Sequence, residues 1–581
     1  TRGFWDLKSP VAAGLFGSLF IGVIGNLDGM LQVVQGAWGR MSQSTAGFTP
    51  FDFWRSSRMI PFQESFDPSP LVFWVADKVP DAPDMSPHIT EFPFFTFLFA
   101  DLHAHMMVIP FTLLVIGLGL NLVVGLRDGG RLWTSLAVAA LAVALGSLWV
   151  VNSWDYPSYA VLVFGLLGLA VYFSRGSLPA KVLLFGVLAV SVFAISLLVF
   201  LPFHQSYETF NSGLDVSKWR TPVGRYLGVH GLFIFIAVTF LLVQSRDILR
   251  SLLNGLLDRS HGPEPQDLRW PRAALGLGLL IAAYLAIAGY WNAVMLLVFL
   301  ILAGVAGWRL IASRDEDRPF AVVPIVLIVM ALLIGIGVDF ARVEGDIGRM
   351  NTFFKYYLEI WVLMSIAAAY MLWQLGATGF LRRKWGWRSA AWVAVLAMLI
   401  GSSLIYTALG SRVRLSDRFT ESPSALDGTG YMMSAVHFER EQAIELKWDR
   451  EAIRWFQDNV QGSPVVLEAH MEQYRWGSRI AIYTGLPTVL GWPWHQIQQR
   501  TDYDFEIFQR ANHVSEIYNT TDVARAVELL RRYDVQYLVV GDLERAVYDG
   551  RGLQKFEKML DEGLVLQVFA NQGVSIYQRA W

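Results

Sequence analysis

The chain has 581 residues, of which 54% are hydrophobic and 17% are charged, and its mean hydropathy is +0.40. This composition excludes an ordinary water-soluble protein of such length and is typical of a protein that crosses a membrane many times. The formal net charge of -2 gives no sign of nucleic-acid binding, and the lack of cysteine excludes disulfides and thiolate metal sites. The sequence starts TRGFWDLKSP, without an initiator methionine or a signal-peptide pattern, so we expect a processed or truncated product.

Apolar runs long enough to cross a bilayer recur along the first 410 residues. A span needs roughly 20 apolar residues, and about eleven segments meet this requirement. They lie near residues 10–26, 104–125, 132–151, 157–174, 180–201, 227–245, 273–290, 292–309, 319–338, 356–377 and 389–409. Charged helices and short β-branched strands follow. The sequence therefore predicts a polytopic α-helical membrane domain over 1–410 and a water-soluble α/β domain over 411–581.

Lysine and arginine are concentrated in alternate loops between the predicted spans, as at Arg127, Arg175 and Arg250. Such loops favour the cytoplasmic side of a membrane. The remaining loops and the soluble domain are then extracytoplasmic. The long outer loops are 27–91, 202–226 and 339–355.

The motif ADLHAH at 100–105 carries Asp101, His103 and His105 inside an otherwise apolar stretch. Ionisable groups at membrane depth cost a few kcal/mol and are kept where they pair or line a wet cavity. On a helix Asp101 and His105 share one face, whereas on an extended segment all three side chains do. They suit acid–base catalysis, or a divalent cation held by Asp101 and His105. Alternatively, Asp101 caps a helix and the histidines bond to neighbouring helices.

The motif NSWDYP at 152–157 has two interpretations as well. Asn152 and Asp155 are typical of a tight turn between helices, and Pro157 suits the first turn of the next helix. Asp155 also lies between Trp154 and Tyr156, where a sugar-binding or metal-facing carboxylate is expected, and it is a candidate catalytic residue.

Segment 339–357 places Arg349 and Lys355 at a predicted membrane mouth. Arginine forks around phosphate oxygens and lysine adds a point charge, so both are predicted to bind phosphate. Six residues apart on a helix, they face partly different directions. The alternative is internal pairing with Asp346 and Glu359.

The C-terminal region shows alternating helical and strand patterns. Helices are predicted at 450–460 and 521–533, and strands at 463–469, 479–485, 536–542, 564–570 and 573–579. The segment 490–500 clusters Trp492, Trp494 and His495, which suits stacking on a sugar ring and equally suits packing against the membrane domain.

Several motifs together resemble one family. FPFFTFLFADLHAHMMVIPFTLL, NSWDYP, RMNTFFKYYLE, RIAIYTGLPTVLGWPWHQ and YLVVGDLERAVYDGRGLQKF resemble the uncharacterised YYY-type family of prokaryotic integral membrane proteins, whose layout is similar to that of GT-C membrane glycosyltransferases. The resemblance implies transfer of a sugar from a polyprenyl-phosphate donor on the outer face of the cytoplasmic membrane. It implies Asp101, His103 and His105 in the active cleft, and Arg349 and Lys355, beside Tyr356, at the lipid phosphate.

The chain departs from the family pattern because it has no triple tyrosine, only Tyr356 and Tyr357. The resemblance also implies further spans before the first one here. We therefore expect a second membrane chain beside residues 10–36 and 92–125 that supplies them. The alternatives to an enzyme are a non-enzymatic scaffold or anchoring subunit and a transporter; the clustering of polar motifs at one membrane face argues against transport.

Overall fold

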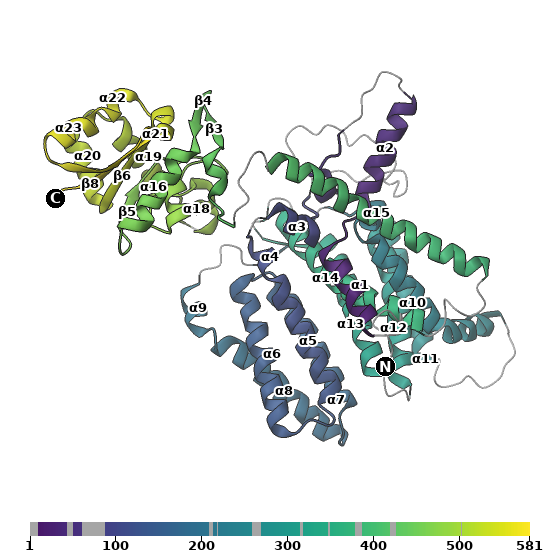
Figure 1. The fold of residues 1–581 in the computed structure, drawn as a ribbon. Helices are drawn as coiled ribbons and strands as arrows, with labels where there is room; N and C mark the ends of the chain where they lie inside the picture. The colour runs from purple at the N-terminus through teal and green to yellow at the C-terminus, as the bar shows by residue number, and fades with distance from the viewer. Residues whose placement is uncertain are drawn as a thin grey trace. The chain divides into compact units, whose positions relative to one another are not determined.

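The computed structural model describes residues 10–42, 50–60, 88–100, 102–207, 213–217, 219–257, 269–313, 318–344, 346, 349–377, 386–418, 426–500 and 502–581. Two compact units divide between Asp417 and Arg418, where the helix labelled α15 in Figure 1 ends. We call residues up to 417 the membrane unit and those from 418 the C-terminal unit.

Long apolar helices make up the membrane unit. Among the described residues, nine helices are long and apolar enough to cross a membrane, and α1 (Pro10–Gly22) and α11 (Arg269–Ile287) are shorter or less apolar. The nine are α4 with α5 (Ala104–Met107 and Ile109–Gly125, one span), α6 (Arg131–Val151), α7 (Asp155–Phe173), α8 (Leu178–Leu198), α10 (Val223–Leu257), α12 (Trp291–Ala312), α13 (Arg318–Phe340), α14 (Met350–Ala377) and α15 (Trp387–Arg418). Nine of the eleven predicted spans overlap these nine helices, and the other two, 10–26 and 273–290, overlap α1 and α11.

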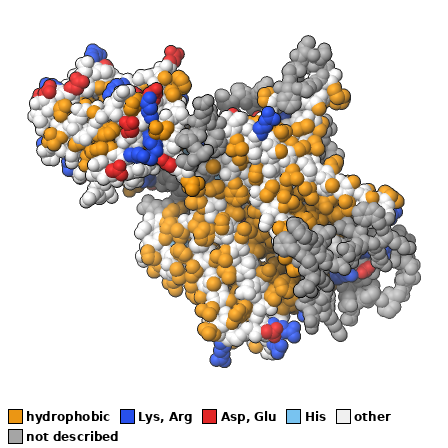
Figure 2. Space-filling view, in the orientation of Figure 1, with side chains coloured by type: hydrophobic (Ala, Val, Ile, Leu, Met, Phe, Trp, Pro, Cys, Tyr) orange, Lys and Arg blue, Asp and Glu red, His pale blue; other side chains and the backbone are white. Residues whose placement is uncertain are grey.

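Helix α14 is the centre of the membrane unit. It packs against α1, α10 and α13, and 78% of its apolar stretch is buried, against 17% for α8. Figure 2 shows hydrophobic side chains over much of the visible surface of this unit, as expected for helices whose outer faces meet lipid. Side chains on α14 are therefore positioned by packing on several sides.

Shorter elements complete the membrane unit. The helices α2 (Asp28–Ser42), α3 (Pro93–Phe99) and α9 (Leu201–Ser206) lie between spans. Strands β1 (Leu214–Val216) and β2 (Ala341–Val343) pair antiparallel, which joins the segment before α10 to the segment before α14.

The C-terminal unit is an α/β domain, as predicted. Its sheet has the order β5-β6-β8-β7, with β5 parallel to β6 and the other pairs antiparallel. The strands are β5 (Val465–Leu467), β6 (Val535–Gly541), β7 (Val565–Ala570) and β8 (Val574–Arg579), with a separate hairpin of β3 (Val436–Glu439) and β4 (Gln442–Glu445). The helices are α16 (Leu446–Asn459), α17 (Arg479–Thr484), α18 (Pro493–Gln499), α19 (Asp504–Asn519), α20 (Val523–Arg532), α21 (Asp542–Val547), α22 (Gly550–Leu553) and α23 (Lys555–Asp561).

The strand predicted at 479–485 is wrong, because this segment is helix α17. The Glu468 carboxylate accepts hydrogen bonds from the backbone N–H groups of Ile480 and Ala481, each at 2.8 Å. These belong to the first turn, where a helix has no internal partner for its N–H groups. A buried glutamate outside the segment thus stabilises a helix, although the alternation of apolar and polar residues in the segment is typical of a strand.

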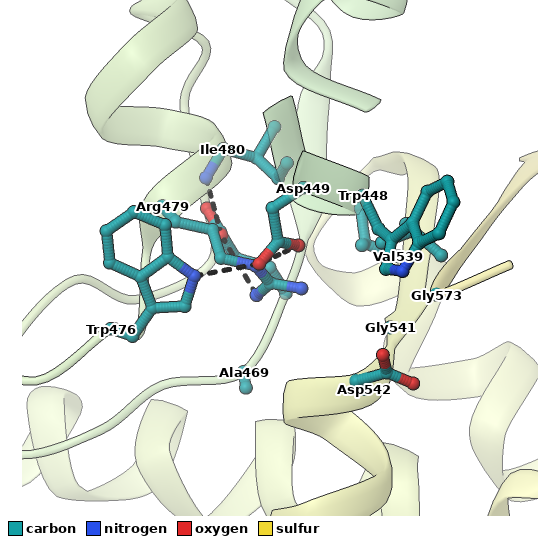
Figure 3. Close-up of polar contacts among 12 residues, drawn as sticks. Trp448, Asp449, Ala469, Trp476, Arg479, Ile480, Val539, Gly541, Asp542 and Gly573 are labelled. Atoms are coloured by element: carbon teal, nitrogen blue, oxygen red, sulfur yellow. Dashed lines mark hydrogen bonds and ion pairs between the residues drawn. The ribbon is translucent and has the colours of Figure 1, made fainter. Parts of the chain in front are cut away.

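Arg479 begins this helix inside the C-terminal core, with no solvent exposure. Its Nε donates to Asp449 at 2.7 Å and its other nitrogens donate to Glu544 at 3.0 and 2.9 Å. Figure 3 shows Asp449 between Arg479 and Trp476, whose indole N–H also donates to Asp449 at 2.8 Å. This network ties α16, α17 and α21 together.

Candidate functional site

Lys355 on α14 is the centre of a buried polar cluster. Its Nζ lies 3.3 Å from Nδ1 of His105, at the start of the span formed by α4 and α5. The other ring nitrogen of His105, Nε2, lies 3.5 Å from the Glu91 carboxylate, whose second oxygen is 3.8 Å from Arg58. His105 and Glu91 are buried, whereas Lys355 is half-buried.

The contacts assign the proton on His105. A lysine ammonium has donors only, so Nδ1 of the imidazole must accept from it. The remaining proton is then on Nε2, which faces the carboxylate of Glu91. Glu91 in turn accepts from the Thr96 hydroxyl at 3.2 Å. The imidazole is therefore held between a cation and an anion in a defined orientation.

Asp155 approaches the same lysine from α7. It begins this helix, is 5% exposed, and accepts a hydrogen bond from the Asn152 side-chain amide. The backbone N–H of Asp155 also donates to the Asn152 carbonyl at 3.1 Å, so the two residues form the predicted turn between α6 and α7. Asp155 and Lys355 line the same small cavity.

Glu359 lies one helical turn after Lys355 and is 3% exposed. In the part of the chain that the structure describes, neither of its carboxylate oxygens has a hydrogen bond of ordinary geometry, and Ser158 on α7 is a polar neighbour. Glu359, Asp155, Lys355, His105 and Tyr159 line a cavity of about 10 Å³. That volume holds about one water molecule.

The segment before this span is not one continuous helix. Helix α3 ends at Ala100, whose φ of 59° is left-handed, and α4 starts at Ala104 with His103 as its N-cap. The His103 side chain is exposed, and its ring centre lies 5.4 Å from that of His105. Asp101 lies outside the described residues, so its predicted roles remain predictions.

Arg349 does not join Lys355. Its guanidinium forms an ion pair with Asp339 at 2.8 Å, and both side chains are 1% exposed. It also donates to the Val338 carbonyl and the Thr221 hydroxyl, at 3.0 and 3.3 Å. The internal pairing considered for Arg349 therefore exists, but its partner is Asp339 in place of Asp346 or Glu359.

Asp346 has a different task. Its carboxylate accepts hydrogen bonds from the backbone N–H groups of Asn351 and Thr352, at 3.0 and 2.8 Å, and so stabilises the first turn of α14. Acidic groups at a helix N-terminus also interact favourably with the helix dipole.

The arrangement around His105 does not suit the predicted cation. Both ring nitrogens face protein groups, one of them the ammonium of Lys355, and a second cation would be repelled there. Within the described residues no group of three or more His, Asp or Glu side chains is placed to hold a metal ion.

The remaining predicted substrate-binding residues fall in two places. Tyr356 is half-buried next to Lys355, and its ring meets Trp154 edge-on with centres 6.2 Å apart. Trp492 and His495 belong to the C-terminal unit, where both rings pack near Tyr474.

Sequence reasoning did not single out Glu91, Glu359 or Arg58 as site residues. A signal existed for the two acids, because each is a lone carboxylate in an aromatic, apolar stretch, HITEFPFF and KYYLEIWVL. Such residues are kept in membranes mainly for pairing or function. Arg58 stands between α2 and α3, in a segment with no comparable signal.

The comparisons with known proteins give one family and a set of distant structures. Residues 4–364, which include all side chains of the Lys355 cluster, match the family described as "Uncharacterized membrane protein (DUF2298)". No curated protein matches the chain.

The solved structures that resemble this chain are of an oligosaccharyltransferase from Archaeoglobus fulgidus, at 14% identity. The apo form has a TM-score of 0.30, with 76% of this chain and 52% of that chain covered. The complex of AglB with an inhibitory peptide and a dolichol-phosphate has a TM-score of 0.30, with 82% and 57% covered. The complex with Zn and sulfate has a TM-score of 0.31, with 82% and 55% covered. In these comparisons the chain spans little more than half the length of the archaeal enzyme.

The family match covers more than half of this chain, and the protein therefore belongs to the DUF2298 family of membrane proteins.

Proposed function

We propose that this protein is a membrane glycosyltransferase that transfers a sugar from a polyprenyl-phosphate donor at the Lys355 cluster, on the extracytoplasmic face. The observation that carries the proposal is the set of ionisable groups held around one lysine: Glu91, Asp155, Glu359 and His105. A single ion pair would neutralise Lys355. Burying three carboxylates and an imidazole there costs free energy that a purely structural role does not require.

The reaction needs two kinds of group, and the cluster has both. As the bond between the sugar anomeric carbon and the phosphate oxygen breaks, negative charge develops on the leaving lipid phosphate. An ammonium such as that of Lys355, half-buried beside His105, stabilises that charge more strongly than water does. The contact with His105, itself fixed by Glu91, holds the amine in place.

The acceptor loses a proton as its oxygen or nitrogen bonds to the anomeric carbon, and a carboxylate takes this proton. Asp155 is the group that we assign to this role. The Asn152 amide binds one of its oxygens, and the other takes the proton in this proposal through the single water that the adjoining cavity can hold. The cavity beside Asp155 and Glu359 holds only about one water, so the sugar itself binds at the mouth, where His103 is exposed and Tyr356 is half-buried. Asp101 and His103 are proposed to contact the substrate there.

The experiment measures release of polyprenyl phosphate from polyprenyl-phosphate-linked sugars by the full chain, extracted in mild detergent together with any partner chain and reconstituted in proteoliposomes. We expect Lys355→Met and Asp155→Asn each to lower the rate roughly 100-fold or more. The matched controls are Lys181→Met, another half-buried lysine, and Asp128→Asn, an exposed aspartate, and both should retain the wild-type rate. If folded Lys355→Met and Asp155→Asn proteins release lipid phosphate within a few-fold of the wild-type rate, the assignment is wrong. If the wild-type protein transfers no sugar from any such donor, the scaffold interpretation replaces the enzyme.

The proposal includes a second membrane chain beside residues 10–36 and 92–125. Within this chain α1 packs against α14, and Val11, Leu15 and Val23 remain exposed at 39%, 49% and 37%. Lipid or a partner helix would cover them. Native mass spectrometry of the complex extracted in mild detergent should show a second polypeptide, whereas an active monomer would contradict this part of the proposal.

A further inference from the structure

The C-terminal unit contains a polar pocket of about 420 Å³, which is too large to be a packing defect. It lies among the β3–β4 hairpin, the segment that follows β5, helix α19 and the end of α21. Its volume falls in the range of small-molecule binding sites, which begins at roughly 300 Å³.

Two buried polar groups in the pocket have no complete set of partners. Glu439 is 8% exposed and meets Arg475 and His437 only at 3.8 and 3.6 Å, beyond hydrogen-bond length. Tyr548 is also 8% exposed, and its ring stacks on Tyr518 with centres 4.5 Å apart. Within the described chain, Oε2 of Glu439 makes no hydrogen bond of ordinary geometry, and the Tyr548 hydroxyl has the backbone of His470 as a polar neighbour, without a bond of ordinary geometry. Buried groups of this kind are normally satisfied, so a ligand that supplies their partners gains affinity.

Further polar groups face the same space. His470 and Ser515 lie across the pocket wall, with Nε2 of the ring 3.2 Å from the hydroxyl oxygen. The charged side chains balance, because Arg440 and Arg475 accompany Glu439 and Glu472. A pocket with equal numbers of cations and anions, and with hydroxyl and imidazole groups between them, favours a neutral ligand rich in donors and acceptors.

An aromatic cluster in the same unit is connected to the pocket lining through the sequence. Tyr474 precedes the pocket residue Arg475, is 74% exposed, and has its ring 5.5 Å from Trp492 and 5.4 Å from His495. Aromatic rings offer a flat apolar face beside polar tips. A sugar ring presents the matching chemistry, since its hydroxyls bind carboxylate and phenol groups while its C–H face lies against an aromatic ring.

We propose that this pocket binds a neutral saccharide of one or two rings, with Glu439 and Tyr548 accepting and donating hydrogen bonds to its hydroxyls. The site is separate in the chain from the Lys355 cluster, so it stands whether or not that cluster transfers sugars. An acidic sugar would gain no net attraction from this balanced lining and would lose the hydration of its carboxylate, so it is disfavoured.

The experiment is saturation-transfer NMR and equilibrium titration on the full chain in lipid nanodiscs, where no sugar-based detergent competes. The probes are methyl glycosides of neutral hexoses, neutral disaccharides and methyl glucuronide. We expect at least one neutral probe to bind and methyl glucuronide to bind about tenfold more weakly or not at all.

Two variants locate the binding. Tyr548→Phe removes one hydroxyl and retains the ring that stacks on Tyr518, and Glu439→Gln removes one charge. Each should weaken binding of that probe about tenfold, the effect of one lost buried hydrogen bond. The controls Tyr503→Phe and Glu441→Gln change exposed side chains outside the pocket and should bind as the wild type does. Lys355→Met should also bind normally, which separates this site from the proposed transfer reaction.

The proposal is overturned if no neutral saccharide of the panel binds, if methyl glucuronide binds best, or if Tyr548→Phe leaves binding unchanged. Should Glu439→Gln fail to fold, the Tyr548→Phe result decides the question alone, because that change leaves the packing of the ring intact.

Discussion

Lys355 and His105 come from helices 250 residues apart in the sequence, yet Nζ of the lysine lies 3.3 Å from Nδ1 of the histidine. Because a lysine ammonium only donates, the contact fixes a neutral imidazole whose Nε2–H faces Glu91. The lysine is thus held by a chain of contacts that ends in a carboxylate. Removing any member should leave the amine less well placed.

Replacement of His105 tests this positioning. We expect His105→Phe, which fills the same space without an acceptor, to reduce sugar transfer about tenfold or more while donor binding weakens less. Release of lipid phosphate gives kcat and KM for the comparison. His105→Gln, whose amide oxygen accepts a hydrogen bond from lysine, should recover part of the loss. Equal rates for the two variants would argue that His105 contributes only packing.

Replacement of Glu359 by glutamine should lower the rate of sugar transfer without lowering the stability of the protein. The Glu359 carboxylate is buried in the described structure without a hydrogen bond of ordinary geometry, so Glu359→Gln should not lower the thermal midpoint in micelles. If the acid shares the proton chemistry of Asp155, the same variant should lose roughly tenfold or more in transfer rate. Loss of stability with full activity would place Glu359 in the packing of the helices alone.

Arg349 and Asp339 form a structural pair, and breaking it should unfold the protein more easily. We expect Arg349→Met and Asp339→Asn each to cost about 3–5 kcal/mol, because each leaves one buried charge without its partner. The two changes together should cost less than their sum. Arg175→Met, which breaks an exposed ion pair with Asp128, should cost less than about 1 kcal/mol. A stable Arg349→Met protein with weakened donor binding would restore the earlier prediction that Arg349 contacts the lipid phosphate.

The C-terminal unit should lose stability as pH rises through the range of one buried acid. Burial raises the pKa of Glu468 from 4.5 to about 7, and the Arg479 guanidinium offsets only part of this rise. Between these values the folded state binds more protons than the unfolded chain, so stability falls with increasing pH by about 3 kcal/mol in total. Glu468→Gln carries no titrating group at this position. The free energy of unfolding of the variant minus that of the wild type should therefore increase from about pH 5 to pH 7 and then stay constant.

Thermal unfolding of the two proteins at several pH values measures this difference. Glu441→Gln, at an exposed position in the β3–β4 turn, is the control and should follow the wild type at every pH. Parallel curves for Glu468→Gln and the wild type would contradict the prediction.

The orientation in the membrane can be tested cleanly because the chain has no cysteine. We expect Arg551→Cys, exposed in the C-terminal unit, to react with an impermeant maleimide on intact cells. Arg175→Cys, exposed between α7 and α8, should react only after the membrane is permeabilised. The reverse pattern would overturn the extracytoplasmic placement of the C-terminal unit and of the Lys355 cluster.

The membrane helices were predictable because their signal is local. A run of about 20 apolar residues has few alternatives in a bilayer, and every predicted span is a helix here. Segment 479–485 was predicted wrongly for the opposite reason. Its conformation depends on the Glu468 carboxylate, which binds the N–H groups of Ile480 and Ala481 from outside the segment.

The site was predictable only in part. Ionisable residues in apolar sequence pointed to His105, Asp155 and Lys355, and the structure brings these three together. Their contacts depend on how α5, α7 and α14 pack against one another. The spacing of residues along the sequence does not predict this packing. For the same reason Arg349 was predicted to bind phosphate, whereas in the structure Asp339, at the end of the preceding helix, pairs with it.

The Arg349–Asp339 pair also sets the rotational phase of α14. The ion pair lies immediately before the helix begins at Met350, and Lys355 follows less than two turns later. An α-helix turns about 100° per residue, so one residue inserted between them would swing the amine away from His105 without changing its chemistry. The ion pair therefore acts together with the packing of α14 to direct Lys355, and the spacing between Arg349 and Lys355 is a requirement of the site in addition to their identities.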